Sequence, residues 1–82
     1  MSTVCSPRNQ QPQPPDLLIR KLIEKLSDGD PRIRRNAAGA LRLHGARAIA
    51  ALPALVALLE DSDHRVREEA ERAVERLRDL AA

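Results

Sequence analysis

The sequence predicts an all-α protein of four helices, arranged as two helical hairpins. Three observations predict this fold. Apolar residues recur at helical spacing, turns rich in Asp separate these stretches, and the whole pattern occurs twice. The 82 residues include no Phe, Tyr or Trp, so the core must be built from Leu, Ile, Val and Ala. Chains of this size with such cores lie close to the limit of stability.

The first 15 residues differ in composition from the rest of the chain. They are rich in Pro, Gln, Ser and Asn and contain few apolar residues, which predicts a disordered tail over residues 1–15. Cys5 is the single cysteine, so no intramolecular disulfide can form, as is typical of proteins in reducing compartments. The N-terminus also lacks a signal-peptide pattern. We therefore expect a cytoplasmic protein.

The first predicted hairpin begins where apolar periodicity begins. Asp16 is a candidate N-cap for a helix that ends near Ser27, before a turn of Asp and Gly. Asp30 followed by Pro is a strong start for the second helix, because Asp caps free N–H groups and Pro needs no donor there. Gly45 is suited to end that helix.

The second predicted hairpin covers residues 47–80. Its first helix carries large apolar residues along most of its length, with Pro53 expected in the first turn or at a slight kink. Because this helix is apolar nearly all round, we expect it to be buried on more than one side. The segment Asp61–Asp63 then turns the chain into the last helix.

The two hairpins are copies of one pattern. A shift of 33 residues superimposes them without a gap and aligns identical residues at Leu22/Leu55, Leu26/Leu59, Asp28/Asp61, Asp30/Asp63, Arg32/Arg65, Arg34/Arg67, Ala37/Ala70 and Ala40/Ala73. A repeat of this length is typical of helical solenoids. We therefore expect one folded region, residues 16–82, made of two repeats at about 16–46 and 47–80.

These repeats resemble HEAT-like repeats of the phycocyanobilin-lyase-like subtype. The resemblance rests on the motif D-x-x-[IV]-R, which opens the second helix of each unit and here covers residues 30–34 and 63–67. It implies an α-α superhelix with the second helices along the concave face. It also implies a structural ladder between turns, formed by the motif residues Asp30, Arg34, Asp63 and Arg67. Such families commonly contain more than the two units found here.

The second-helix face is the candidate partner-binding surface. It is expected to present Arg35, Arg42, Arg72 and Glu75, with His44 at the end of its helix. A histidine on an apolar stripe can be a ligand or a proton switch, but more often it ends a helix with its ring half packed. We interpret His44 chiefly in the second way.

Several other function classes find little support in the sequence. No nucleophile lies in a pattern with His and Asp, no His/Cys cluster has metal-ligand spacing, and no Gly-rich phosphate loop is present. We therefore expect no enzymatic activity, no metal and no cofactor. The longest uncharged run, residues 48–59, is too short to span a bilayer, so no membrane association is expected. Nucleic acid is disfavoured because Glu68, Glu71 and Glu75 are expected to share the arginine-bearing face.

The predicted function is therefore a protein-interaction module or small scaffold with an unidentified protein partner. An alternative, suggested only by the repeat subtype, is an accessory subunit of a chromophore-lyase-type complex. A weaker alternative is nucleic-acid binding through the arginines. Because a repeat of this kind buries its apolar face against neighbours, the exposed ends of the stack also suggest a homo-oligomer.

Overall fold

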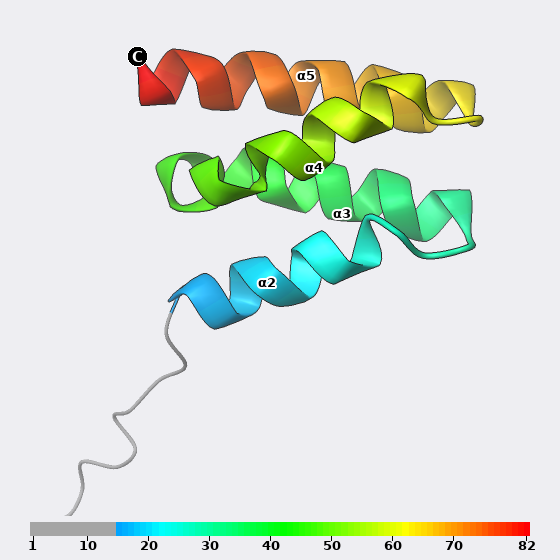
Figure 1. Cartoon of the computed structure of the whole chain (residues 1–82), viewed down its shortest axis with the longest axis horizontal. Coiled ribbons are helices and arrows are strands. Elements are labelled where there is room, and N and C mark those ends of the chain that lie inside the picture. The colour runs from blue at the N-terminus through cyan, green and yellow to red at the C-terminus, as the bar shows by residue number, and fades with distance from the viewer. Residues whose placement is uncertain (1–14) are drawn as a thin grey trace, which may run out of the picture.

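The computed structural model describes residues 15–82, which form three helical segments and contain no strand (Figure 1). α2 spans Pro15–Lys25 and α5 spans His64–Ala81. Between them lies one continuous helical segment, made of α3 (Pro31–His44), the 3₁₀ helix η2 (Gly45–Ala51), α4 (Leu52–Ala57) and the 3₁₀ helix η3 (Leu58–Glu60). Short turns at residues 26–30 and 61–63 join this segment to α2 and α5. The all-α prediction is confirmed. The prediction of four separate helices is wrong, because no non-helical residue separates α3 from α4.

Gly45 and Pro53 explain the shape of the middle segment. Gly45 caps α3 with φ 64° and ψ −134°, a conformation that residues with a Cβ avoid, and its N–H donates to the carbonyl of Arg42. At this point the chain reverses direction (Figure 1). Pro53 lies in the first turn of α4, as predicted, and cannot donate a backbone hydrogen bond to the preceding turn. A 3₁₀ helix therefore fills the interval between these two residues.

The helix starts predicted for α3 and α5 are confirmed. Asp30 caps α3 and Asp63 caps α5, each through a side-chain oxygen that accepts from backbone N–H groups of the first turn. The start of α2 is less well predicted, since that helix already includes Pro15 and Asp16. The rest of the predicted tail, residues 1–14, lies outside the residues that the structure describes.

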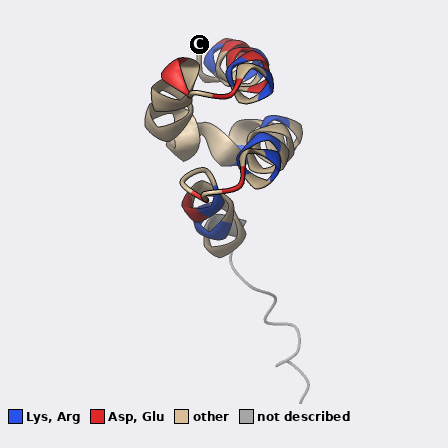
Figure 2. Cartoon of the chain, turned by 90° about the vertical axis from the view of Figure 1, so that its right-hand side faces the viewer, with Lys and Arg blue, Asp and Glu red and all other residues tan. Residues whose placement is uncertain are grey.

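The helices form two rows that share one core (Figures 1 and 2). α3 and α5 lie beside each other in one row and form the most extensive contact between elements, while η2 and α4 pack against α5 from the other side. Four fully buried side chains fill the centre: Leu41, Leu55, Val66 and Leu77. Alanines complete the core at points where helices approach closely, including Ala38, Ala48 and Ala73. The apolar stripes read from the sequence therefore face one another.

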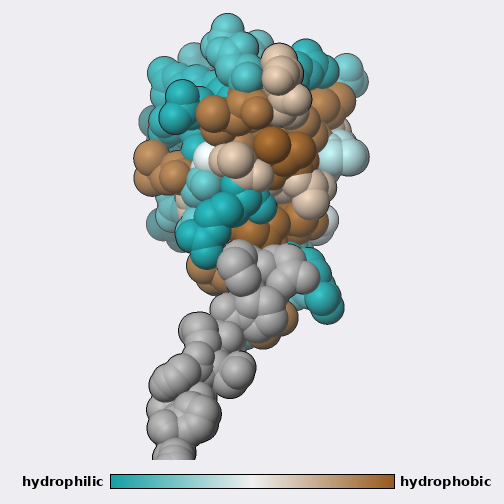
Figure 3. Space-filling view, turned by 90° about the vertical axis from the view of Figure 1, so that its left-hand side faces the viewer, coloured by the Kyte–Doolittle hydropathy of each residue, from teal (hydrophilic) through white to brown (hydrophobic). Residues whose placement is uncertain are grey.

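Apolar side chains also remain on the surface. Figure 3 looks onto the end of the molecule where α3 passes into η2 and where α5 ends, and hydrophobic residues gather across it. Leu43, in the last turn of α3, is 79% exposed, and Leu80, near the end of α5, is 38% exposed. Surface apolar residues that gather in this way are typical of interaction surfaces.

The helical run Pro31–Glu60 is long and apolar enough to cross a membrane by length and composition alone. Its most apolar window of 18 residues has a mean hydropathy of 1.4, and 22% of that window is buried. The expectation that no such segment exists is therefore not met on this criterion. Core helices of soluble proteins pass the same test, and here Gly45 reverses the run while Ala51 and Leu55 are fully buried in the core. The match is weak evidence for a membrane span.

Candidate functional site

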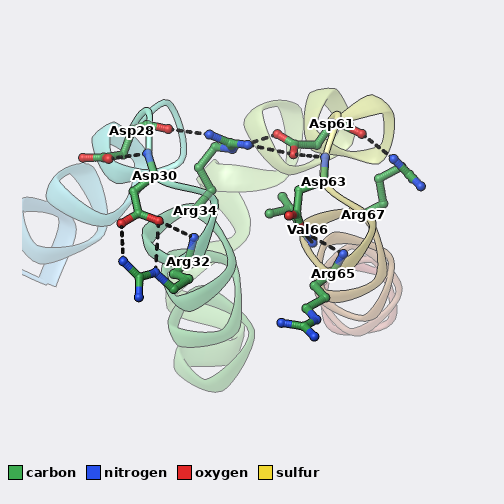
Figure 4. Close-up of polar contacts among 9 residues, drawn as sticks. All are labelled: Asp28, Asp30, Arg32, Arg34, Asp61, Asp63, Arg65, Val66 and Arg67. Carbon is green, nitrogen blue, oxygen red and sulfur yellow. Dashed lines mark hydrogen bonds and ion pairs between the residues drawn. The ribbon is translucent and has the colours of Figure 1, made fainter.

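The turns between helices are ordered by pairs of aspartates (Figure 4). In the first turn, Asp28 Oδ1 accepts from the N–H of Asp30 at 2.8 Å, and Asp30 Oδ1 accepts from the N–H of Arg32 at 2.9 Å. Asp61 and Asp63 repeat this arrangement in the second turn, where the Asp63 N–H lies 2.9 Å from Asp61 Oδ2. These hydrogen bonds join residues of the same turn, so they order each turn without help from the other repeat.

Arg34 joins the two turns. Its Nε and Nη2 donate to the two carboxylate oxygens of Asp61 at 2.8 and 3.0 Å, and its Nη1 donates to the carbonyl of Asp28 at 2.7 Å. The Arg34 and Asp61 side chains are only 14% and 9% exposed. The hydrogen bonds from Arg34 hold the pKa of Asp61 below its usual value. Such a two-pronged contact fixes orientation as well as charge.

A ladder between turns therefore exists, but its carboxylates differ from those predicted. Asp30 and Asp63 are helix caps, and Asp61 is the carboxylate that pairs with Arg34. Arg67 makes the same backbone contact as Arg34, because its Nη1 donates to the carbonyl of Asp61 at 2.7 Å. Among the described contacts, Arg34 reaches from one turn to the other, whereas Arg67 contacts only its own turn.

A groove of about 720 Å³ lies between α3 and α5. Four arginines and two glutamates supply its charged lining, and the residues that line it are Arg35, Asn36, Gly39, Ala40, Arg42, Leu43, Arg65, Glu68, Glu69 and Arg72. Figure 2 shows these two helices end-on, with basic and acidic residues along the side of the molecule that they form. The groove is the largest hollow described on residues 15–82 and combines positive charge with one strongly exposed leucine.

Glu69 organises the floor of this groove. Its Oε2 accepts from Arg42 Nε at 2.9 Å, and its Oε1 lies 3.6 Å from Arg72 Nη1, while its side chain is 13% exposed. A Cβ added to Gly39 would lie 3.3 Å from Glu69 Oε2. Gly39 therefore lets the carboxylate approach α3 closely, which accounts for a glycine in a helix interior where alanine is otherwise preferred.

Comparison with known protein families identifies the repeats. The family model for HEAT repeats matches residues 19–82, which include every helix after the start of α2. The chain belongs to the HEAT repeat family. The match is to HEAT repeats in general and does not support the phycocyanobilin-lyase-like subtype. Comparison with curated proteins and with solved structures gives no match.

Three of the predicted partner-binding residues of this HEAT pair lie together. Arg35, Arg42 and Arg72 all line the groove between α3 and α5. Glu75 instead lines a different hollow, beside Leu59 and Val74. His44 is half-buried at the end of α3 and lines none of the hollows described here.

Sequence reasoning missed the residues that complete the groove. Glu69 and Arg65 were not singled out, although Arg42 and Glu69 are 27 residues apart, as are Arg34 and Asp61. That separation becomes visible only when the two units are packed together, so the sequence alone carries no signal that pairs these residues. Of the three glutamates expected beside the arginines, only Glu68 lines the groove; it also pairs with His64 at 3.1 Å.

Among the residues that the structure describes, no group of three or more His, Cys, Asp or Glu side chains lies close enough to hold a metal ion. The carboxylates of the turns accept hydrogen bonds from their own backbone, and Glu69 is engaged by two arginines. The described carboxylates of the turns and of the groove floor are thus already engaged by backbone N–H groups or by arginines.

Proposed function

We propose that the chain is a non-catalytic protein-interaction module whose groove between α3 and α5 holds an acidic segment of a partner protein. HEAT repeats typically mediate protein–protein interactions, and the groove of about 720 Å³ lies between the second helices of the two units. In this proposal the two units form a short piece of an α-α superhelix, act in the cytoplasm as a scaffold, and need no membrane and no cofactor.

Two arginines of the groove have no acidic partner among the described residues, and this positive charge supports binding of an acidic segment. Arg42 and Arg72 share Glu69, whose single negative charge offsets one of their two positive charges. Arg35 and Arg65 also line the groove, and neither forms an ion pair with another residue of the described range 15–82. Arginine is the side chain best suited to bind carboxylates through paired hydrogen bonds.

Leu43 adds an apolar contact to this charged surface. It lines the groove and is 79% exposed, so a partner that covers it gains burial of apolar area. The preferred segment is therefore acidic with at least one apolar side chain. Protein is favoured over nucleic acid because no aromatic residue is present to stack on a base.

Fluorescence anisotropy with a short labelled peptide of glutamate and leucine tests this function. The double variant Arg35→Gln/Arg65→Gln is expected to weaken binding by about tenfold or more, since each arginine loses charge-assisted hydrogen bonds. Arg47→Gln is the matched control, because Arg47 is exposed on η2 and does not line the groove. Equal binding by the double variant and the control overturns the proposed site.

A single-stranded oligonucleotide of similar length serves as the competing probe. The proposal expects weaker binding of the oligonucleotide than of the peptide at the same salt concentration. Tighter binding of the oligonucleotide, with a steep decline as salt rises, would replace the acidic protein segment with nucleic acid as the ligand.

A further inference from the structure

The two ends of the repeat stack carry hollows that lie on opposite sides of the repeat. We name the first the N-terminal stack face; its hollow of about 340 Å³ is lined by residues that include Leu22, Lys25, Asp28, Ile33 and Asn36. We name the second the C-terminal stack face; its hollow of about 440 Å³ is lined by Leu59, Glu71, Val74, Glu75, Arg78 and Asp79. The C-terminal stack face shares no lining residue with the groove proposed above, whereas Asn36 and Ala40 line both the groove and the N-terminal stack face.

The junction between the two units shows what each face is built to contact. Leu55 and Val66, the equivalents of Leu22 and Ile33 one repeat later, are fully buried where the first unit packs on the second. In the first unit Leu22 is only partly buried and Ile33 is 37% exposed. The N-terminal stack face thus has the shape and apolar character of a repeat surface without its preceding neighbour.

The C-terminal stack face is the other half of such a junction. Leu26 is 3% exposed at the internal junction, whereas its equivalent Leu59 is only partly buried and lines the hollow. Within residues 15–82, one face therefore lacks a preceding unit and the opposite face lacks a following one. A contact between the two faces would repeat the geometry of the internal junction.

The arginine ladder supplies the polar part of this match (Figure 4). Arg67 donates to the Asp61 carbonyl at 2.7 Å, and Arg34 donates to the Asp28 carbonyl at the same distance. Each guanidinium group is therefore held by the equivalent carbonyl of its own turn. Arg34 also pairs with the Asp61 carboxylate through its Nε and Nη2, but Arg67 forms no ion pair with a described residue. At the opposite end Asp28 has the place that Asp61 has in its turn, with one oxygen on a backbone N–H at 2.8 Å.

A second polar pair could form between the two faces, with the donor and the acceptor on the opposite sides from those at the internal junction. At the internal junction Arg42 donates to Glu69. One repeat later Glu75 stands in the place of Arg42, and one repeat earlier Asn36 stands in the place of Glu69. The Asn36 amide can donate to the Glu75 carboxylate, so the exchanged pair is still complementary.

The two faces also differ in charge. Glu71, Glu75 and Asp79 make the C-terminal stack face acidic, against Arg78 alone. The hollow of the N-terminal stack face contains one basic and one acidic side chain, Lys25 and Asp28. Repulsion between two acidic C-terminal stack faces disfavours contact between like faces.

We propose that a second copy of this chain docks on these faces head to tail, with Arg67 of one copy pairing with Asp28 of the next. The contact is heterologous, so each added copy leaves one face of each kind open, and association continues until a ring closes. Neither Arg67 nor Asp28 lines the groove, so the proposed pair does not depend on what the groove binds.

Light scattering over a dilution series from about 1 mM to about 1 µM tests the proposal. The mass of the unmodified chain should rise with concentration and pass beyond that of a dimer. Arg67→Gln and Asp28→Asn should each raise the concentration needed for association by about tenfold or more. Asn at position 28 keeps the side-chain oxygen that accepts from the Asp30 N–H, which preserves the turn.

Mixing the two variants distinguishes head-to-tail from symmetric association. The Arg67→Gln chain still offers Asp28, and the Asp28→Asn chain still offers Arg67. An equimolar mixture should therefore form a heterodimer that grows no further. A mixture no heavier than its components, or variants that associate as the unmodified chain does, would overturn the proposal.

Arg65→Gln is the matched control, since Arg65 lies on the same helix as Arg67 but lines the groove. It should leave the mass unchanged while weakening peptide binding, so failure of the groove and failure of the stack contact give different results. A chain that stays monomeric at about 1 mM overturns self-association.

Discussion

Truncation of two repeat-equivalent leucines measures how much the packing of one unit on the other contributes to stability. Leu55 is 0% exposed, and its equivalent Leu22 is only partly buried at the N-terminal stack face. Leu55→Ala removes a fully enclosed side chain and leaves a cavity, which costs about 3 kcal/mol. Leu22→Ala removes atoms that already face solvent in part, and it should cost about 1 kcal/mol.

These costs are large for a chain of this size. A folded region of this length has a free energy of unfolding of roughly 3–10 kcal/mol, so Leu55→Ala removes a substantial part of it. With a slope near 1 kcal/mol per molar urea, the midpoint should fall by about 3 M for Leu55→Ala and by about 1 M for Leu22→Ala. Even the unmodified chain should therefore unfold at moderate urea concentration.

Urea unfolding followed by far-ultraviolet circular dichroism is the suitable assay, because the chain has no Trp or Tyr whose fluorescence could report unfolding. The measurement belongs at low micromolar concentration, where association between copies is weakest. Equal losses for the two variants, or a larger loss for Leu22→Ala, would refute the reasoning. Such a result would mean that the first unit is covered as completely as the second.

Three further predictions concern single side chains. Because the pKa of Asp61 is lowered by Arg34, its contribution to stability is present above the usual value of 3.8 and is lost as pH falls through the lowered pKa. Acid titration of the unfolding midpoint should show that loss, and Asp61→Asn should flatten it. Gly39→Ala should stabilise the chain by about 1 kcal/mol only in the presence of Glu69→Ala, because the Glu69 side chain otherwise occupies the space of the new Cβ. A double-mutant cycle based on urea unfolding measures this coupling. Gly45→Ala should destabilise the chain by about 1–2 kcal/mol in the same assay because of the positive φ, and an unchanged midpoint would contradict the assigned backbone conformation.

The features that could be predicted from sequence are those set by neighbouring residues. Asp30 and Asp63 act on backbone N–H groups within three residues, and Gly45 acts through its own φ. Each of these was predicted because the cause and the effect lie in one short segment. The apolar stripes were predicted for the same reason, since helical spacing alone aligns them.

The features that could not be predicted depend on how the two units meet. The two aspartates of a turn have similar sequence surroundings. In the second turn the first of them, Asp61, pairs with Arg34 of the other unit, and only the relative position of the two turns decides this. The groove likewise requires the relative placement of α3 and α5, which brings Arg42 and Glu69 together across 27 residues. The helical link between α3 and α4 was missed because Gly45 was expected to end helical structure, and it ends only α3.

A contact from an arginine to an aspartate of the next turn occurs within the chain at Arg34 and is proposed between copies at Arg67. Comparing the same substitution at these two equivalent positions separates its effect on folding from its effect on association. Arg34 and Arg67 are equivalent and both donate to a turn carbonyl, but Arg34 also holds Asp61 within the same chain. The change Arg34→Gln removes a nearly buried pair inside the protein, so it should lower the urea midpoint at every protein concentration. The same change at Arg67 removes no ion pair within residues 15–82, so it should lower the mass in solution while the midpoint of the dilute chain changes far less. Equal effects of the two changes on dilute-solution stability would mean that Arg67 acts within its own chain, and the ladder would then have no open end.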